Sequence, residues 1–340
     1  MTIRIPAEWE PHACCWMAWA VHPEWADWTE DVKAELDEIV RVISQFEPVR
    51  LLTPATELDD ALARFAGGNV EIVEAPVDDI WMRDIAPSFA LRGNQVVAID
   101  WNFNSWGGTK KRPVRQGDRI ASAVPSVFEV PRLSVSFVAE GGALITDGQG
   151  NLVTTRSCLL SPTRNPVRGS ENRERIIERD LMRLGIHHVI WLEGDPCEPG
   201  TNGHVDGYVL FKAPGAVLVE VSDDKQVEPA MWRAHDIALL ENAKDVAGNL
   251  FDVEQVRSPR KRWWRFKGHN FAASYLNAYI ANGAVITARF GDNERDDEAM
   301  NILEKAFPQR KIIMLRIDHI AGGGGGVHCL TQPMPITVGR

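Results

Sequence analysis

The sequence lacks long hydrophobic runs and has fewer basic residues than acidic ones. No apolar stretch approaches the ~20 residues that a membrane-spanning helix needs. The opening stretch MTIRIPAEWEPH has none of the apolar character of a signal peptide, so we expect a cytoplasmic protein with no membrane partner. Lys and Arg number 37 against 47 Asp and Glu, which leaves a net charge of −10. This balance argues against nucleic acid as a partner, because phosphate contacts need a basic face.

Cysteine is scarce and irregularly spaced. The five cysteines are Cys14, Cys15, Cys158, Cys197 and Cys329, and no two of them form a CxxC pair. Neither a disulfide framework nor a zinc ribbon is therefore indicated. A metal site of another kind would need several ligands, and the single H-x-D step has no second cluster to complete it. We expect most of these thiols to be small buried residues, and we expect no metal.

The remaining composition is that of a folded protein with a large core. Hydrophobic residues make up 44% and charged residues 25% of the 340 positions. No stretch rich in Pro or Ser is long enough to divide the chain. We therefore expect a single domain over residues 1–340, of the α/β class.

A strand–turn–strand pattern recurs along the chain. The four predicted hairpins turn at glycines 93, 148, 215 and 283, which lie 55, 67 and 68 positions apart. They cover Pro87–Asp100, Ala143–Ser157, Tyr208–Val221 and Tyr275–Ala288. Helical spacing of apolar residues predicts helices within Asp27–Phe46, Glu171–Leu184, Pro229–Ala243 and Glu294–Ala306. Such a period indicates one unit used several times, and a fifth unit built from both ends of the chain would close a ring.

Unusual polar residues fall in the loops between these units. Asp84 lies in DIWMRDIAP, Glu140 in AEGG, and His204 with Asp206 in TNGHVDG, while Cys329 follows five glycines. If the units form a ring, these loops converge on one concave site. We predict His204 and Asp206 to lie on an extended strand, where side chains two apart point to the same face.

Each of these residues also has a purely structural interpretation. Asp84 beside Arg83 could form a surface ion pair, His204 and Asp206 a hydrogen-bonded loop pair, and Cys329 a buried thiol. Taken together, the residues supply carboxylates to hold a cation, a histidine base and a thiol nucleophile. A planar guanidinium binds carboxylates through its fork of N–H donors, so the set suits attack on a guanidinium carbon.

Several motifs resemble those of a known family. They include DIWMRDIAP, WNFNSWGG, AEGG, TTRSCLLSPTRNP, TNGHVDG and GGGGGVHCLTQP, and they extend over nearly the whole chain. By these motifs the sequence resembles the agmatine deiminase and bacterial-type peptidylarginine deiminase family of guanidine-modifying enzymes. The resemblance implies the pentein fold, a five-bladed α/β propeller of strand–hairpin–helix modules around a central active site.

The resemblance also implies roles for individual residues. Cys329 would be the nucleophile and His204 the general acid and base, with Glu140 orienting His204. Asp84 and Asp206 would grip the guanidinium nitrogens and complete the catalytic set. The implied reaction needs neither a metal nor another cofactor: it is hydrolysis of a small guanidino substrate, agmatine first, to the ureido product and ammonia through a covalent thiouronium.

Two further expectations come from the resemblance. Trp81 and Trp106 would wall the substrate pocket, and the protein would form a homodimer. Two basic segments, 109–115 and 257–267, depart from the family pattern. We expect these segments to be surface loops at the rim of the pocket and not a nucleic-acid site. A basic rim would repel the ammonium end of agmatine. A guanidino substrate with an anionic group, peptidyl-arginine, and amidino transfer on the same fold therefore stay open.

Overall fold

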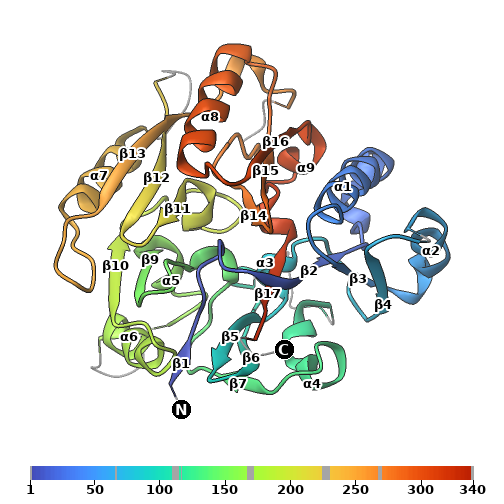
Figure 1. Cartoon of the computed structure of the whole chain (residues 1–340), viewed down its shortest axis with the longest axis horizontal. Coiled ribbons are helices and arrows are strands. Elements are labelled where there is room, and N and C mark those ends of the chain that lie inside the picture. Colours follow the sequence, from blue (N-terminus) through green and yellow to red (C-terminus); the bar gives the residue numbers. More distant parts are fainter. Residues whose placement is uncertain are drawn as a thin grey trace.

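The computed structural model describes residues 2–65, 67–108, 115, 117–166, 172–223, 230–266 and 270–337. Within these residues the strands form five separate small sheets arranged around a common centre (Figure 1). Four sheets are built on an antiparallel hairpin whose second strand also pairs in parallel with a later strand. The same sequence of pairings therefore recurs around the ring, as the repeat in the sequence predicts.

The strands of the five sheets have the following bounds. The first sheet contains β1 (Ile3–Arg4), β5 (Ser88–Arg92), β6 (Gln95–Asp100) and β7 (Arg132–Ser134). The second contains β8 (Ile145–Thr146), β9 (Asn151–Thr155) and β10 (His188–Leu192), and the third β11 (Val209–Ala213), β12 (Ala216–Val221) and β13 (Asp252–Arg257). The fourth contains β14 (Tyr279–Ala281), β15 (Ala284–Ala288) and β16 (Lys311–Leu315). The fifth contains β2 (His12–Ala18), β3 (Val49–Thr53), β4 (Val70–Glu74) and β17 (Gln332–Pro335).

The fifth sheet joins the two ends of the chain. Gln332 of β17 pairs with Trp16 of β2 in antiparallel register, and β2 pairs in parallel with β3. The predicted closing unit is thereby confirmed. The sequence did not predict that β1 would add to the edge of the first sheet, where Ile3 pairs with Arg92.

All four predicted hairpins are present, and two are shorter than predicted. β8 has only two residues because Gly141–Ala143 forms a turn of 3-10 helix before it. β14 begins at Tyr279 because residues 274–277 belong to a loop whose polar groups hydrogen-bond elsewhere. The middle strands are buried on both faces, as in β15 (Ala284–Ala288), so apolar runs rather than alternation mark them in the sequence.

The four predicted helices are also present. They are α1 (Thr29–Ile43), α6 (Arg173–Arg183), α7 (Ala230–Asn242) and α8 (Asn293–Ala306). Shorter helices are α2 (Leu58–Phe65), α3 (Met82–Ile85), α4 (Val124–Val127), α5 (Arg156–Leu159) and α9 (Asp318–Gly322). No helix in the described ranges combines the length and apolar character needed to cross a bilayer.

The strand predicted for His204 and Asp206 is wrong. His204 precedes a turn of 3-10 helix at Val205–Gly207, and β11 begins only at Val209. Asn202 and Gly203, directly before His204, have φ values of 61° and 88°, which an extended strand does not adopt, so the chain bends before the hairpin starts. Glu140 lies in a loop as predicted, between β7 and the turn of 3-10 helix at Gly141–Ala143.

Buried carboxylates tie the helices to strand ends. Asp296 of α8 accepts hydrogen bonds from the Tyr275 hydroxyl at 2.7 Å and from the backbone N–H groups of Phe290 at 3.1 Å and Gly291 at 2.9 Å. Asp236 of α7 accepts a hydrogen bond from the backbone N–H of Gly194 at 3.1 Å. These contacts fix each helix to a loop of the ring and satisfy backbone donors that would otherwise be buried without a partner.

We predict that Asp296→Ala destabilises the protein by about 2–4 kcal/mol, because three buried donors lose their acceptor. The matched control is Asp297→Ala, since Asp297 is the neighbouring residue on α8 and is exposed. That control should change stability by no more than about 0.5 kcal/mol. Thermal and urea unfolding of both variants measures the difference, and equal effects would contradict the prediction.

Candidate active site

Five equivalent loops bring the site together. Each loop leads from the last strand of one sheet to the first strand of the next hairpin, so all five reach the centre of the ring (Figure 1). In chain order they carry Asp84, Glu140, His204 with Asp206, Asn277, and Cys329. All of these side chains except that of Cys329 are buried, and Cys329 is half-buried. The five residues predicted from the sequence therefore meet in one place.

The thiol of Cys329 lies between an amide and a carboxylate. Its Sγ is 3.2 Å from Asn277 Nδ2 and 3.7 Å from Asp206 Oδ2. The Cys329 N–H donates to Asn277 Oδ1 at 3.3 Å, so one side chain holds both the backbone and the sulfur. Burial raises the pKa of the Cys329 thiol well above its ordinary value, and the charges of Asp206 and Asp84 raise it further. In this arrangement the sulfur carries its proton.

The imidazole of His204 is surrounded by carboxylates. Nε2 is 3.3 Å from Glu140 Oε2, and Nδ1 is 3.8 Å from Asp84 Oδ1 and 3.9 Å from Asp206 Oδ1. Burial acts to lower the pKa of His204, but the charge of Asp84 and the hydrogen bond to Glu140 outweigh it, and the pKa is raised well above its ordinary value. His204 is therefore an imidazolium with a proton to donate, and its Nδ1 has no hydrogen-bond partner among the residues that the structure describes.

Glu140 is held by a cation that the sequence analysis did not single out. Arg164 Nε donates to Oε1 at 2.7 Å and to Oε2 at 3.0 Å, and both side chains are fully buried. Burial raises the pKa of Glu140, but Arg164 and His204 more than offset this and lower it overall. Arg164 Nη1 also donates to Asn202 Oδ1 at 2.8 Å, which ties this pair to the loop that carries His204.

Glu140, Cys158 and His204 also place three donor atoms within 4.8 Å of one another. This spacing would suit a metal ligand set. The Glu140 carboxylate, however, already binds the guanidinium of Arg164, and the His204 imidazole is protonated. A metal ion would have to displace both positive charges, so these residues fit a hydrogen-bonded ion pair better than a metal site.

Asp84 is held by a tryptophan side chain and by the backbone N–H of a glycine. Trp106 Nε1 donates to Asp84 Oδ2 at 2.8 Å, and the Gly142 N–H donates to Asp84 Oδ1 at 3.0 Å. Trp106 has a positive φ of 54°, a backbone conformation that is strained for a bulky residue and recurs at functional sites. Burial raises the pKa of Asp84, and the nearby imidazolium of His204 opposes that rise.

Trp81 borders the glycine run that precedes Cys329. A Cβ at Gly325 would lie 2.3 Å from the Trp81 ring, so only glycine allows this loop to lie flat on the indole. The rings of Trp81 and Trp25 are 6.0 Å apart. A wall of the substrate pocket formed by Trp81 and Trp106 stays a prediction.

Three arginines of the basic segments are paired with acidic residues. Arg115 Nη2 is 3.0 Å from Asp79 Oδ2, and Arg257 Nε is 2.8 Å from Glu298 Oε1. Arg260 forms a bidentate contact with Asp292. Positions 109–114 and 267 lie outside the described residues. These three arginines present little uncompensated positive charge, whereas the contacts of Arg262 and Arg265 within the described residues are with aromatic rings. A guanidino substrate with an anionic group therefore stays an open alternative.

Three further residues of the site were not predicted from the sequence: Arg164, Asn277 and His328. Asn277 occupies the loop of the fourth module, and the repeat itself pointed to that loop. Arg164 lies in TTRSCLLSPTRNP, where nothing in the spacing links it to Glu140. His328 precedes Cys329, and its Nδ1 is 2.7 Å from Asp206 Oδ2.

The chemical capacity of the site follows from these contacts. A thiol, an imidazolium and several carboxylates share one buried cluster. Such a set of groups is typical of a cysteine-dependent enzyme that binds a cation.

Comparison with known proteins supports this class of enzyme. The family model for Porphyromonas-type peptidyl-arginine deiminase matches residues 4–335, and the chain belongs to that family.

Individual relatives are agmatine deiminases. A protein of that name from Medicago truncatula is 34% identical over 98% of this chain and 96% of its own length. One from Pseudomonas aeruginosa is 34% identical over 98% of this chain and 95% of its own. The solved agmatine deiminase of Enterococcus faecalis superposes with a TM-score of 0.89 at 29% identity, over 99% of this chain and 96% of that one. The expected pentein fold is thereby confirmed.

We predict that Gly142→Ala lowers the pKa of His204. A Cβ at Gly142 would lie 2.6 Å from His204 Nδ1, 2.9 Å from Asp206 Oδ2 and 3.0 Å from Asp84 Oδ1. These groups must separate, which weakens the attraction that keeps the imidazole charged. NMR titration of the ring, assigned with His204→Asn, measures the change. Gly207→Ala is the control because no atom lies within 4 Å of its Cβ, and an equal shift there would refute the explanation.

Proposed function

We propose that this protein is an agmatine deiminase, a hydrolase that converts agmatine and water to N-carbamoylputrescine and ammonia. The observation that carries the proposal is the meeting of Cys329, His204, Asp84 and Asp206 in one cluster. Relatives of matching length named agmatine deiminase support the choice of substrate. Neither a metal nor an organic cofactor takes part in this proposal.

Asp84 and Asp206 bind the guanidinium. Both carboxylates lie near His204 Nδ1, with their Oδ1 atoms at 3.8 and 3.9 Å, so a planar cation bound there meets an acceptor from each. Carboxylates suit such a cation because each can accept two of its N–H donors. Once bound, the guanidinium carbon faces the sulfur of Cys329, which is 3.7 Å from Asp206 Oδ2.

The first half of the reaction forms a covalent intermediate. The Cys329 thiolate attacks the guanidinium carbon, and a carbon–sulfur bond forms as the π electrons move to nitrogen. His204 gives its proton to one terminal nitrogen, the carbon–nitrogen bond breaks, and ammonia leaves. A thiouronium on Cys329 remains, and His204 is now neutral.

The second half releases the product. Neutral His204 takes a proton from water, whose oxygen attacks the thiouronium carbon. The carbon–sulfur bond then breaks and its electron pair returns to the sulfur. The proton on the adduct's oxygen passes to that sulfur, which restores the resting thiol, and the neutral ureido product leaves. Glu140, held by Arg164, keeps the His204 ring in place through both proton transfers.

The positive charge of the substrate favours ionisation of the Cys329 thiol, which is a poor nucleophile while it is protonated. Burial, Asp206 and Asp84 all raise the pKa of Cys329 in the unliganded site. A guanidinium between the two carboxylates adds one positive charge beside the sulfur, and loss of the thiol proton compensates it. The nucleophile therefore forms when the substrate is present, which protects the resting thiol from other electrophiles.

Two finer expectations belong to the same proposal. We place the protein in the cytoplasm, where its five cysteines stay reduced, and we expect a homodimer on the family resemblance. All five cysteines are among the described residues, and each of them is a free thiol there.

We predict that the purified protein releases ammonia and N-carbamoylputrescine from agmatine in equal amounts, in the presence of EDTA and without an amine acceptor. Cys329→Ser should lower kcat by roughly 10³-fold or more, because a serine hydroxyl is not ionised at neutral pH. Cys197→Ser is the matched control, since Cys197 is exposed, and it should retain full activity.

A panel of arginine, a peptidyl-arginine and an ω-guanidino acid, run in parallel, tests the substrate assignment. Higher kcat/KM on any of them than on agmatine would overturn the assignment while leaving the reaction class intact. Dependence of turnover on an added amine would instead indicate amidino transfer.

We also predict that a positively charged haloacetamidine alkylates Cys329 about 100-fold faster at pH 7 than the neutral haloacetamide of the same size. The cation binds the carboxylates and favours the thiolate, whereas the neutral reagent meets a protonated thiol. Mass spectrometry of the labelled peptides compares the two rates, and exposed Cys197 in the same sample should show no such preference. Equal rates at Cys329 would contradict substrate-assisted ionisation.

A further inference from the structure

His328 lies behind the site with a carboxylate on each side of its ring. Its Nδ1 is 2.7 Å from Asp206 Oδ2, and its Nε2 is 2.9 Å from Glu8 Oε2. An ionised carboxylate only accepts hydrogen bonds, so each ring nitrogen must donate. An imidazole that donates from both nitrogens is protonated, and the ring therefore carries a positive charge between Asp206 and Glu8.

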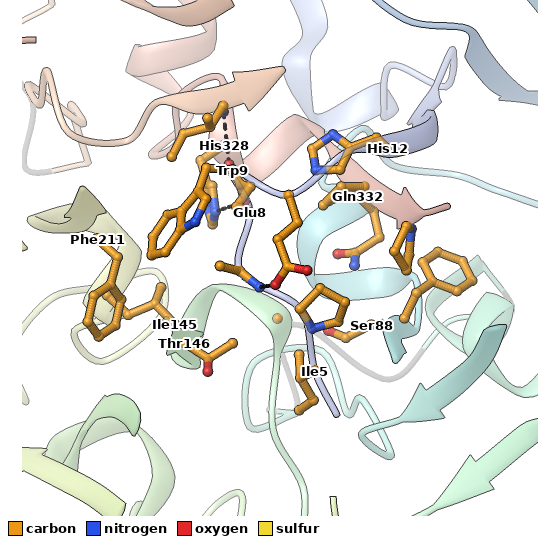
Figure 2. Close-up of a pocket in the computed structure, with 18 of the residues that line it drawn as sticks. Ile5, Glu8, Trp9, His12, Ser88, Ile145, Thr146, Phe211, His328 and Gln332 are labelled. Carbon is orange, nitrogen blue, oxygen red and sulfur yellow. Dashed lines mark hydrogen bonds and ion pairs between the residues drawn. The ribbon is translucent and has the colours of Figure 1, made fainter. Parts of the chain in front are cut away.

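Glu8 is itself firmly held. It comes from the segment between β1 and β2, which crosses the centre of the ring (Figure 1). Its Oε1 accepts from the Ile280 N–H at 3.0 Å, and its Oε2 also accepts from Arg83 Nη2 at 2.8 Å. Figure 2 shows Glu8 and His328 together at the edge of a cavity of about 90 Å³, which is also lined by Trp9 and Gln332.

Glu8 and His328 are linked to the guanidinium-binding groups through Asp206. Oδ2 of Asp206 is taken by His328, and the same oxygen faces the Cys329 sulfur at 3.7 Å. Oδ1 faces His204 at 3.9 Å. The carboxylate is thus oriented by its contact with His328, and its other oxygen is directed to the space where the guanidinium binds.

We propose that His328 is a positioning residue, an imidazolium that Glu8 keeps charged and that holds the Asp206 carboxylate in the orientation needed to bind the guanidinium. The inference rests on the proposed deiminase function. It extends the site to a chain of contacts running from Glu8 through His328 to Asp206, supplied by loops far apart in the sequence.

The charges around His328 explain why Glu8 is needed. Arg83 lies against the same group: its Nε donates to the His328 carbonyl at 3.3 Å, and its charge disfavours an imidazolium. Burial also lowers the pKa of His328, while Glu8 and Asp206 raise it, and the net shift is upward. The other titratable groups near Asp206 are His204, Cys329 and Asp84. Removing the charge of Glu8 leaves burial and Arg83 acting against the protonated ring.

The test compares Glu8→Gln with Glu10→Gln. Glu10 is in the same segment but pairs with Arg4 near the surface, so its variant should keep the wild-type pH profile. In Glu8→Gln the imidazolium is lost at lower pH, because the group that raised its pKa is gone. The alkaline fall of kcat/KM on agmatine should therefore move to lower pH by about one unit, and KM should rise more than kcat falls. A residue that only fills space would leave the profile unchanged.

Substitutions of His328 separate hydrogen bonding from packing. His328→Asn keeps a donor near the position of Nδ1, whereas His328→Leu keeps bulk but no donor. We expect kcat/KM to fall about 10-fold in the first and at least about 100-fold in the second, measured at a temperature where both variants are folded by circular dichroism. Equal losses in the two variants, or an unchanged pH profile in Glu8→Gln, would overturn the role of His328.

An independent measurement separates this inference from the proposed function. Absence of ammonia release by the wild-type protein would overturn the function. The NMR titration of the His328 ring then decides the inference on its own. A ring whose pKa lies above that of an ordinary histidine in the wild type and falls in Glu8→Gln supports the contact chain, and a wild-type ring with an ordinary or lowered pKa overturns it.

Discussion

Compensation of buried charge is the constraint on which this site depends. Four carboxyl groups, those of Glu8, Asp84, Glu140 and Asp206, are gathered at the centre of the ring. Burying an uncompensated carboxylate is costly, and cations therefore lie against them: Arg83, Arg164, His204 and His328. The unliganded site is close to charge balance with its thiol protonated. Adding a guanidinium disturbs that balance, and ionisation of Cys329 restores it.

The ring of five sheets is what allows such a cluster to exist. Each module presents one loop to the centre, and no single loop carries more than part of the chemistry. Asp84, Glu140 and Cys329 come from three different loops, yet hydrogen bonds from Gly142, Arg164 and Asn277 fix each of them. Because each loop is anchored in sheets at both ends and held by these hydrogen bonds, separation of the carboxylates to relieve their repulsion is opposed. The counter-cations are consequently a structural requirement as well as a chemical one.

The repeat, the hairpins and the main helices could be predicted from the sequence because each depends on local pattern. Glycine turns and helical spacing are read within about 15 residues, and the structure agrees at all four hairpins and all four helices. The sequence also predicted the convergence of five side chains: Asp84, Glu140, His204, Asp206 and Cys329. The extended strand predicted for His204 and Asp206 was wrong.

What could not be predicted depends on contacts between distant segments. Arg164 reaches Glu140 across 24 positions, and Glu8 reaches His328 across 320. No periodicity connects such pairs, and an arginine or a glutamate in a loop is far more often a surface residue. The turn of 3-10 helix after His204 is likewise set by where the loop must point, which tertiary packing determines.

The pairing of β17 with β2 bears on how this protein is made. On the ribosome, β2 is complete long before Gln332 exists, and at ~5–20 residues per second the delay is roughly 15–60 s. During that interval β2 has a partner on one side only, and its other edge, which includes Cys14 and Trp16, offers unpaired backbone groups. Ring closure is therefore a late event in biosynthesis, and a nascent chain is inert towards guanidines and prone to wrong pairings until it occurs.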